Sequence, residues 1–313
     1  MAKSFIIGVD LGGTSLRIAL FDVKYKIRRK YIFDTARFLR KDSLVAAIIT
    51  SVNKIIQSEK LNKCNILGVG LGLPGPINAQ KGLVHFFPNI PGWNEVGLKK
   101  ILERKLGLPV YLDNDVNLMA LAEYAFGAAK GARNVVCLTL GTGVGGGIII
   151  DAKLYRGSAF AAGEIGHIPI NEKGPKCNCG GQACLEAYIG NKRIIQEAKK
   201  IFKRQISLEE LSAMARRKNQ KAIGIWREVG RRLGIALCAI INSLNPDIIV
   251  MGGGVAEAGP VLFNQVKKTI LERAMPIQAR HVRVHKAKLG SDAGLIGAAI
   301  LVREGSQFLA LAS

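Results

Sequence analysis

Residues 4–22 read SFIIGVDLGGTSLRIALFD, and this stretch decides the fold. An apolar run ends in Asp10, the pair Gly12-Gly13 follows, and a second run with alternating apolar residues covers 15–22. Two short strands joined by a glycine turn are the usual source of such a pattern, so we expect a β-hairpin. A third strand is expected at 30–36, after a basic turn.

The same pattern returns in the second half of the chain. Residues 134–140, NVVCLTL, form a predicted strand that enters the glycine-rich run 141–147, and a second strand is expected at 148–150. Elsewhere the periodicity predicts alternating elements: helices at 42–59, at 94–106 and from 115 to about 126, and strands at 65–73 and 110–112. Two α/β domains of related topology with a cleft between them are therefore expected. The predicted boundaries are 1–117 for the first domain and 118–295 for the second, with a final helix at about 296–313 that packs back on the first.

Composition bounds the possible functions. The chain has 313 residues and is 49% apolar, so it can bury two cores, and its 36 glycines cluster in runs, which indicates backbone lying close to a ligand. The apolar runs are too short to cross a bilayer and the N-terminus lacks the pattern of a secretory signal, so a cytoplasmic protein without a membrane partner is expected. Cys64, Cys137 and Cys238 show no pairing pattern and are predicted to be small buried residues.

The net charge of +22 raises the alternative of a nucleic-acid-binding protein. Much of the excess positive charge lies between Lys192 and Arg232, a segment that contains thirteen Lys or Arg and four Glu. The region from Ile223 to Leu244 also carries an apolar stripe at helical spacing. A solvated helical face is therefore favoured, and a nucleic-acid partner is not expected.

Both glycine turns could hold phosphate groups. In Asp10–Arg17 (DLGGTSLR) the backbone N–H groups could bind phosphate oxygens, Thr14 adds a hydroxyl, and Asp10 could hold Mg²⁺ through water. An ordinary hairpin turn is the alternative here and at 141–147, but two such turns in corresponding places are harder to ascribe to accident. Neither turn matches the phosphate loop of Walker-type NTPases or the dinucleotide fingerprint.

Two further segments end predicted strands with polar or small residues. In 245–254, NPDIIVMGGG, the glycines would let a flat group such as a nucleobase lie against the backbone, although a tight strand-to-helix connection would also explain them. At Asp113-Asn114-Asp115 the residue types suit a general base and an amide that binds a hydroxyl, or ordinary helix N-caps.

The segment 163–186, GEIGHIPINEKGPKCNCGGQACLE, contains one histidine and three cysteines, His167, Cys177, Cys179 and Cys184. Four nitrogen and sulfur ligands make a closed tetrahedral zinc site, so a structural zinc ion is favoured over a core histidine with three buried thiols. Glu164 and Glu186 flank this set, which makes a role in a polar pocket more credible than simple surface exposure.

Taken together, these motifs resemble the ROK family (repressor, open reading frame, kinase), most closely its glucokinase branch. The segments that carry the resemblance cover nearly the whole chain: DLGGTSLRIALFD at 10–22, LGLPGPIN at 71–78, FPNIPGW at 87–93, LDNDVNLMALAE at 112–123, LGTGVGGGIII at 140–150, GEIGH to CLE at 163–186 and NPDIIVMGGGV at 245–255. The resemblance implies the two-domain actin-like ATPase fold, which is ribonuclease H-like, and a homodimer or homotetramer.

The resemblance also implies roles for individual residues. Asp115 would be the catalytic base. The sugar would be bound by Gly75, Asn89, Asn114, Asp115, Glu164, His167 and Glu186. The nucleotide would be bound by Asp10, Gly12, Gly13, Thr14, Arg17, Gly141, Thr142, Gly143, Gly253 and Gly254. His167 would use its other ring nitrogen for zinc.

Two positions depart from the family pattern. Ala183 stands where glycine often precedes the third cysteine, and a methyl group fits there unless the backbone needs a positive φ. Ser15-Leu16-Arg17 replaces a common lysine-isoleucine pair, so Arg17 could supply the positive charge.

The function implied by the resemblance is transfer of the γ-phosphoryl group of ATP to the 6-hydroxyl of an aldohexose, first of all glucose, with Mg²⁺ and a structural Zn²⁺. A kinase for fructose, mannose or an N-acetylhexosamine is the alternative, because hydroxyl-binding residues suit many sugars. A sugar-responsive transcription regulator is disfavoured, since its DNA-binding winged helix would have to precede Asp10.

Overall fold

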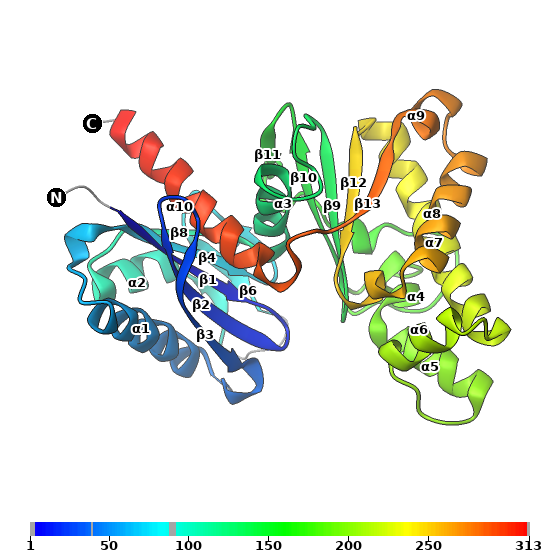
Figure 1. Cartoon of the computed structure of the whole chain (residues 1–313), viewed down its shortest axis with the longest axis horizontal. Helices are drawn as coiled ribbons and strands as arrows, with labels where there is room; N and C mark the ends of the chain where they lie inside the picture. The colour runs from blue at the N-terminus through cyan, green and yellow to red at the C-terminus, as the bar shows by residue number, and fades with distance from the viewer. Residues whose placement is uncertain (1–3, 39, 88–91, 312–313) are drawn as a thin grey trace. The chain divides into compact units, whose positions relative to one another are not determined.

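The computed structural model describes residues 4–38, 40–87 and 92–311. The chain divides into two compact units. Unit 1 comprises Met1–Ala122, Arg156–Ala162 and Ser291–Ser313, and unit 2 comprises Glu123–Tyr155 and Gly163–Gly290. Each unit is built from one five-stranded sheet and its covering helices (Figure 1).

The two sheets share one topology, in which the first three strands are antiparallel and the next two add in parallel. The strand order is β3-β2-β1-β4-β8 in unit 1 and β11-β10-β9-β12-β13 in unit 2. The repeated strand, glycine turn and strand of the sequence thus open each sheet, as predicted.

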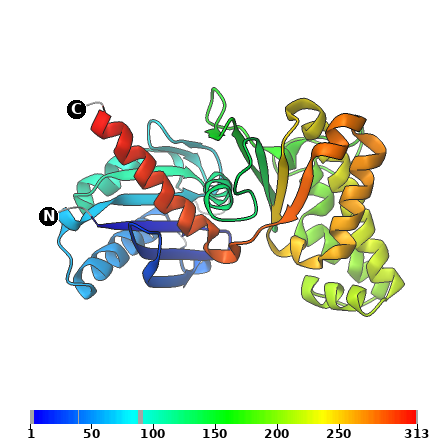
Figure 2. The same cartoon turned by 45° about the horizontal axis from the view of Figure 1, so that its top comes forward.

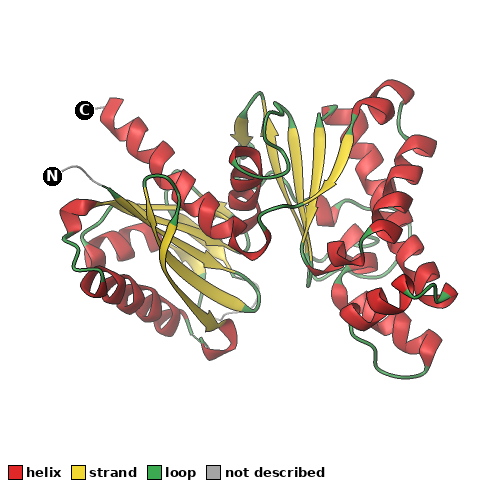
Figure 3. Ribbon diagram, in the orientation of Figure 1, coloured by secondary structure: helices red, strands yellow, loops and turns green. Residues whose placement is uncertain are grey.

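Unit 1 buries its sheet between helices on both faces (Figure 3). Its strands are β1 (Phe5–Leu11), β2 (Ser15–Asp22), β3 (Ile27–Asp34), β4 (Ile66–Leu73) and β8 (Val110–Asn114), with a small second sheet of β5 (Ile77–Asn78), β6 (Leu83–Phe86) and β7 (Asn94–Val96). Its helices are α1 (Lys41–Ser58), α2 (Leu98–Leu106) and α10 (Ala293–Leu311), with the short 3₁₀ turns η1 (Thr35–Arg37), η2 (Lys63–Asn65) and η5 (Gly290–Asp292) beside them.

Alternation along β1 explains the two layers. Ile7 and Val9 join the core formed with α1 and α2, whereas Ile6 joins the core formed with α10. Figure 2 shows α10 crossing the strands of this sheet. Close approach requires small residues: a Cβ on Gly70 would lie 2.0 Å from the carbonyl oxygen of Ala298.

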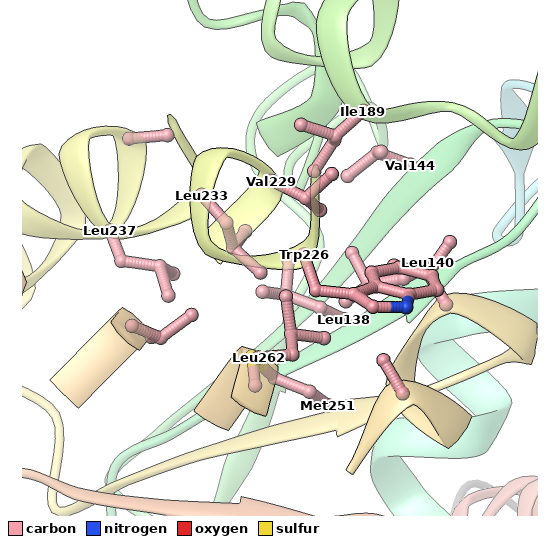
Figure 4. Packing of buried hydrophobic residues seen from close by; sticks show 14 of the residues in the cluster. Leu138, Leu140, Val144, Ile189, Trp226, Val229, Leu233, Leu237, Met251 and Leu262 are labelled. Atoms are coloured by element: carbon pink, nitrogen blue, oxygen red, sulfur yellow. The ribbon is translucent and has the colours of Figure 1, made fainter. Parts of the chain in front are cut away.

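Unit 2 packs its helices on the sheet around Trp226, which has no exposed surface. Its strands are β9 (Val135–Leu140), β10 (Val144–Ile150), β11 (Lys153–Tyr155), β12 (Ile248–Gly252) and β13 (Arg283–Lys286). Its helices are α4 (Leu185–Ile189), α5 (Asn191–Phe202), α6 (Leu208–Arg216), α7 (Gln220–Leu244), α8 (Pro260–Arg273) and α9 (Pro276–His281), with η3 (Ile165–His167) and η4 (Gly254–Ala258). Figure 4 shows the Trp226 indole among Leu138, Leu140 and Met251 of the strands and Leu262 of α8. Most of the predicted apolar stripe therefore lies on the buried face of α7, whereas Leu244 at its end is exposed.

The division between the units falls within helix α3 (Asp115–Ala125), after Ala122, whereas the sequence places it after residue 117. The contacts explain the position. Leu118 packs on Gly72 and Gly297 of unit 1, while the carboxylate of Glu123 accepts hydrogen bonds from the Lys288 and Leu289 N–H groups of unit 2.

Three local predictions were wrong. Residues 94–96 are not helical but form β7, because they pair with β6. The second strand of the unit 2 hairpin begins at Val144, not at 148, so most of the glycine run lies inside β10. Cys64 is exposed in η2, while Cys137 and Cys238 are buried. None of the helices over the described residues is long and apolar enough to span a membrane.

Candidate active site and metal centre

The first glycine turn joins β1 to β2 and faces solvent. Gly12 donates its N–H to the Ser15 carbonyl at 2.9 Å, which closes the turn, and Thr35 braces it by donating its hydroxyl to the Gly12 carbonyl at 3.2 Å. Gly13 and Thr14 are exposed, and a Cβ on Gly13 would meet no atom within 4 Å. The turn can therefore admit a ligand against its backbone.

Asp10 lies at the end of β1 with its carboxylate almost entirely buried. Burial raises the pKa of Asp10 from 3.8 to about 6, and the neighbouring Arg17 guanidinium, whose Nη1 is 3.3 Å from Oδ2, opposes this shift only in part. Arg17 also donates to the Ser291 carbonyl at 3.2 Å. Gly294 leaves room for the carboxylate, since a Cβ there would lie 2.4 Å from Oδ1. An incompletely compensated carboxylate of this kind is suited to a further cation.

The strand ends of unit 1 bring Asp10 close to Asp115. In the parallel register Asp10 pairs with Gly72 of β4, and Gly72 pairs with Asp113 of β8. A Cβ placed on Gly72 would lie 3.6 Å from Oδ1 of Asp10 and 3.5 Å from Cα of Asp115. The side chain of the proposed phosphate-side acid and the backbone of the proposed base thus lie close to the same glycine at one edge of the sheet.

Asn114 connects this edge to the turn after β4. Its Oδ1 accepts the Val116 N–H at 2.8 Å, so it caps α3, and its Nδ2 donates to the Gly75 carbonyl at 3.2 Å. Gly75 has φ +85°, a conformation that favours glycine. Asp115 is the first residue of α3. Of the predicted sugar-binding residues, Gly75, Asn114 and Asp115 gather here, while Asn89 lies outside the described residues.

Asp113, the remaining acid of this triplet, has a partner that sequence reasoning missed. Its side chain is 2% exposed and forms an ion pair with Arg156, with Nη2 2.7 Å from Oδ2. The two residues are 43 positions apart, so spacing along the chain could not reveal the pair.

In unit 2 the second glycine turn meets Glu186. The turn is short: the Gly141 N–H donates to the Gly143 carbonyl at 2.9 Å, and β10 begins at Val144. Glu186, from the first turn of α4, accepts the Val144 N–H at 2.9 Å. A Cβ on Gly143 would lie 2.5 Å from its Oε2. A residue predicted for the phosphates and one predicted for the sugar are therefore neighbours in this unit.

Gly253 and Gly254, after β12, differ in what they require. Gly253 has φ +86°, and a Cβ there would lie 2.4 Å from the Leu140 carbonyl oxygen, so its packing alone demands glycine. Around Gly254 no atom lies within 4 Å of an added Cβ. Both residues are exposed, so the backbone of both is open to a ligand, and Gly254 also has free space where a Cβ would stand.

The predicted metal ligands converge. One ligand atom from each of His167, Cys177, Cys179 and Cys184 lies within 4.8 Å of all the others. Cys179 Sγ and Cys184 Sγ are 3.8 Å apart, and Cys177 Sγ is 3.6 Å from His167 Nδ1. A tetrahedron with Zn–S bonds of about 2.3 Å has edges of roughly 3.8 Å, so the four donors fit zinc.

The loop around this cluster orients its histidine and strains one residue. Nδ1 of His167 faces the thiols, and Nε2 lies 3.7 Å from Oε2 of Glu164, which is exposed. The Gly181 N–H donates to Cys179 Sγ and lowers the pKa of that thiol. Ala183 has φ +58°, in the left-handed region. A residue with a Cβ is less stable than glycine in this conformation, so the methyl group of Ala183 costs on the order of 1 kcal/mol.

Comparison with known proteins identifies the family of this chain. The model of the ROK family matches residues 6–305. The chain belongs to the ROK family. A glucokinase of Thermotoga maritima is 34% identical over 318 residues, which cover 97% of this chain and 99% of that protein.

Solved structures of ROK proteins superpose closely. A ROK family glucokinase from Streptomyces griseus, in complex with glucose and AMPPNP, matches with a TM-score of 0.83 at 33% identity, covering 96% of this chain and 100% of that one. A ROK family transcriptional regulator matches with a TM-score of 0.89 at 27% identity, covering 98% of this chain and 80% of that one. The predicted actin-like ATPase fold and ROK membership are confirmed.

Proposed function

We propose that this ROK protein is an ATP-dependent hexokinase that transfers the γ-phosphoryl group to the 6-hydroxyl of an aldohexose, with glucose as the first substrate to test. The observation that carries the proposal is the proximity of Asp10 and Asp115 at one edge of the sheet, where a Cβ on Gly72 would lie 3.6 Å from Oδ1 of Asp10 and 3.5 Å from Cα of Asp115. Phosphoryl transfer needs an acid that manages phosphate charge beside a base that activates an alcohol. The glucokinases among the relatives support the same reaction.

In unit 1, Asp115 would accept the proton of the sugar hydroxyl while its oxygen attacks the γ-phosphorus, releasing ADP and a sugar 6-phosphate. Asn114 would orient a sugar hydroxyl, and its bonds to α3 and to Gly75 hold it in place. The first turn would bind the phosphates through Gly12, Gly13 and Thr14, with Arg17 beside Asp10. Asn89 belongs to the same proposed sugar-binding set.

In unit 2, Glu164, His167 and Glu186 would bind sugar hydroxyls. The bond from Val144 to Glu186 holds this carboxylate against the second turn. Gly141, Thr142 and Gly143 would contact the phosphates, and Gly253 with Gly254 would form the backbone surface for adenosine.

ATP is the proposed donor, supported by the AMPPNP in the Streptomyces griseus structure. Asp10 fits Mg²⁺, since it is a hard oxygen donor whose burial Arg17 offsets in part, and the ion would neutralise phosphate charge. The four ligands of the zinc cluster leave no position for water, so zinc would brace the loop that presents Glu164, His167 and Glu186.

An ADP-release assay with ATP, Mg²⁺ and a panel of hexoses tests the proposal, with the 6-phosphate product identified by mass and NMR. Asp115→Asn should abolish turnover and leave nucleotide and zinc binding intact. Asp151→Asn is the matched control, because Asp151 is 70% exposed and pairs only with the equally exposed Arg133 among the ion pairs of the described residues. Substantial turnover by Asp115→Asn would remove the base assignment.

The same panel decides the sugar. If fructose, mannose or an N-acetylhexosamine has the highest kcat/KM, that sugar becomes the proposed substrate in place of glucose. These alternatives are tested because the proposed hydroxyl-binding residues suit a ring that many sugars share.

A sugar-responsive transcription regulator is the second candidate, favoured by the TM-score of 0.89 to a regulator. This chain spans 80% of that regulator but the full length of the compared glucokinase. Sequence-specific DNA binding that survives moderate salt, together with no turnover of any sugar, would establish this alternative.

A further inference from the structure

The buried acid next to the proposed base is fully bonded. Asp113 Oδ1 accepts the Asn114 N–H at 2.8 Å and the Asn117 side-chain amide at 2.9 Å. Its Oδ2 lies 2.7 Å from both Nε and Nη2 of Arg156. Two of its donors, Asn114 and Asn117, stand at the N-terminal turn of α3, on either side of Asp115. The carboxylate therefore ties together the backbone that carries the proposed base.

Arg156 reaches this acid from a compact loop. The loop covers residues 156–162 and is closed by the Ala162 N–H, which donates to the Arg156 carbonyl at 3.0 Å. Its contacts place it in unit 1, although β11 precedes it and Gly163 and Glu164 follow it in unit 2. The side chain of Arg156 is 26% exposed, and that of Asp113 is 2% exposed. A buried carboxylate that loses a cationic partner is strongly destabilised in that position.

From this geometry we propose that Arg156 is a positioning residue for the sugar-kinase reaction, acting through Asp113 on the turn that presents Asn114 and Asp115. The inference rests on the proposed function. Within the described part of the chain, the side chain of Arg156 forms its hydrogen bonds and ion pair with Asp113, and not with the proposed base or with the turns assigned to phosphate. Its effect should therefore be on alignment of the acceptor hydroxyl and not on nucleotide binding.

The size of the effect follows from the geometry needed for transfer. Without Arg156, the buried carboxylate of Asp113 loses the cation that holds its Oδ2, and a shift of this carboxylate would release Asn114 and Asn117. Misplacement of a catalytic group by about 1 Å can cost on the order of 100-fold in rate. The loss should appear in kcat and in KM for the sugar, while KM for ATP stays unchanged, because the first glycine turn keeps all its bonds.

The experiment compares Arg156→Met with Arg133→Met, steady-state kinetics being measured for both ATP and the best hexose of the wild-type protein. Arg133 is the matched control, since its side chain is 74% exposed in an exposed ion pair. Arg156→Lys keeps one cationic donor and should recover part of the lost kcat. Asp113→Asn is the second variant, to be used if Arg156→Met fails to fold. Asn has the same shape as Asp, and the partly exposed Arg156 side chain can turn toward water in this variant. Circular dichroism and zinc content establish that each variant is folded.

Three outcomes would overturn the inference. The first is kcat and sugar KM in folded Arg156→Met equal to those of Arg133→Met. The second is a rise in KM for ATP as large as the change in the sugar parameters, since that indicates general loosening. The third is unchanged kinetics in Asp113→Asn. A wild-type protein that turns over no sugar would instead refute the proposed function itself, and this inference with it.

Discussion

Replacing Asp10 with Asn should stabilise the protein at neutral pH while it removes the proposed phosphate-side acid. The carboxylate is 10% exposed and its burial outweighs the favourable contact with Arg17, because the net effect is a raised pKa. Asn has the same shape, so the close approach of Gly294 is kept, and its amide oxygen can still accept from Arg17. The substitution therefore removes a buried charge and little else.

The magnitude follows from the pKa. Burial raises the pKa of Asp10 from 3.8 to about 6, which corresponds to about 3 kcal/mol at 1.36 kcal/mol per unit. Below pH 3.8 the acid is protonated in both folded and unfolded chains and costs nothing. Between these pKa values the folded chain holds more protons than the unfolded one, so stability falls as pH rises, and the full penalty applies above the folded pKa.

Thermal and denaturant unfolding of wild type and Asp10→Asn across pH 3.5 to 8, without added Mg²⁺, measures this directly. The variant should match wild type at the acid end and gain up to about 3 kcal/mol by neutral pH, while kinase turnover is lost. Asp151→Asn should show no such pH-dependent gain, because Asp151 is exposed. A variant less stable than wild type at pH 8 would mean that the ion pair with Arg17 outweighs desolvation, and the reasoning would be refuted.

Three other substitutions test other parts of the structure. Glu123→Gln places an amide against the Ala128 N–H, which now donates to Oε2 at 2.7 Å, and should lower stability by about 1–3 kcal/mol in thermal unfolding. Gly143→Ala puts a methyl group where Glu186 Oε2 lies and should lower kcat/KM for the sugar at least about tenfold, whereas Gly224→Ala, whose Cβ meets no atom within 4 Å, should not. Cys179→Ser should lose zinc, measured by elemental analysis, and sugar affinity together, since the same loop carries both; normal sugar binding without zinc would contradict the bracing role.

The elements that the sequence predicts well are those set by neighbouring residues. The hairpin at 5–22 follows from alternation and a glycine turn, and the convergence of one histidine and three cysteines follows from their spacing within a short segment. The failures share a different cause. Residues 94–96 are a strand because they pair with β6, and Gly146 lies in β10 because it pairs with Leu138 of β9. Both outcomes depend on pairing with another strand, which the periodicity of a segment by itself does not encode.

The three acids at the strand ends of unit 1 show why the site needed the structure. In the sequence Asp113 and Asp115 are equivalent candidates for the base, since both lie at the strand-to-helix junction. In the fold Asp113 is buried and accepts from Asn114, Asn117 and Arg156, so its lone pairs are committed and it has no access to an alcohol. Asp10 is buried but incompletely compensated, which suits it to a cation. Different environments suit identical side chains to different tasks. We therefore keep Asp115, whose Oδ1 accepts the Val116 N–H at 3.0 Å, as the proposed base.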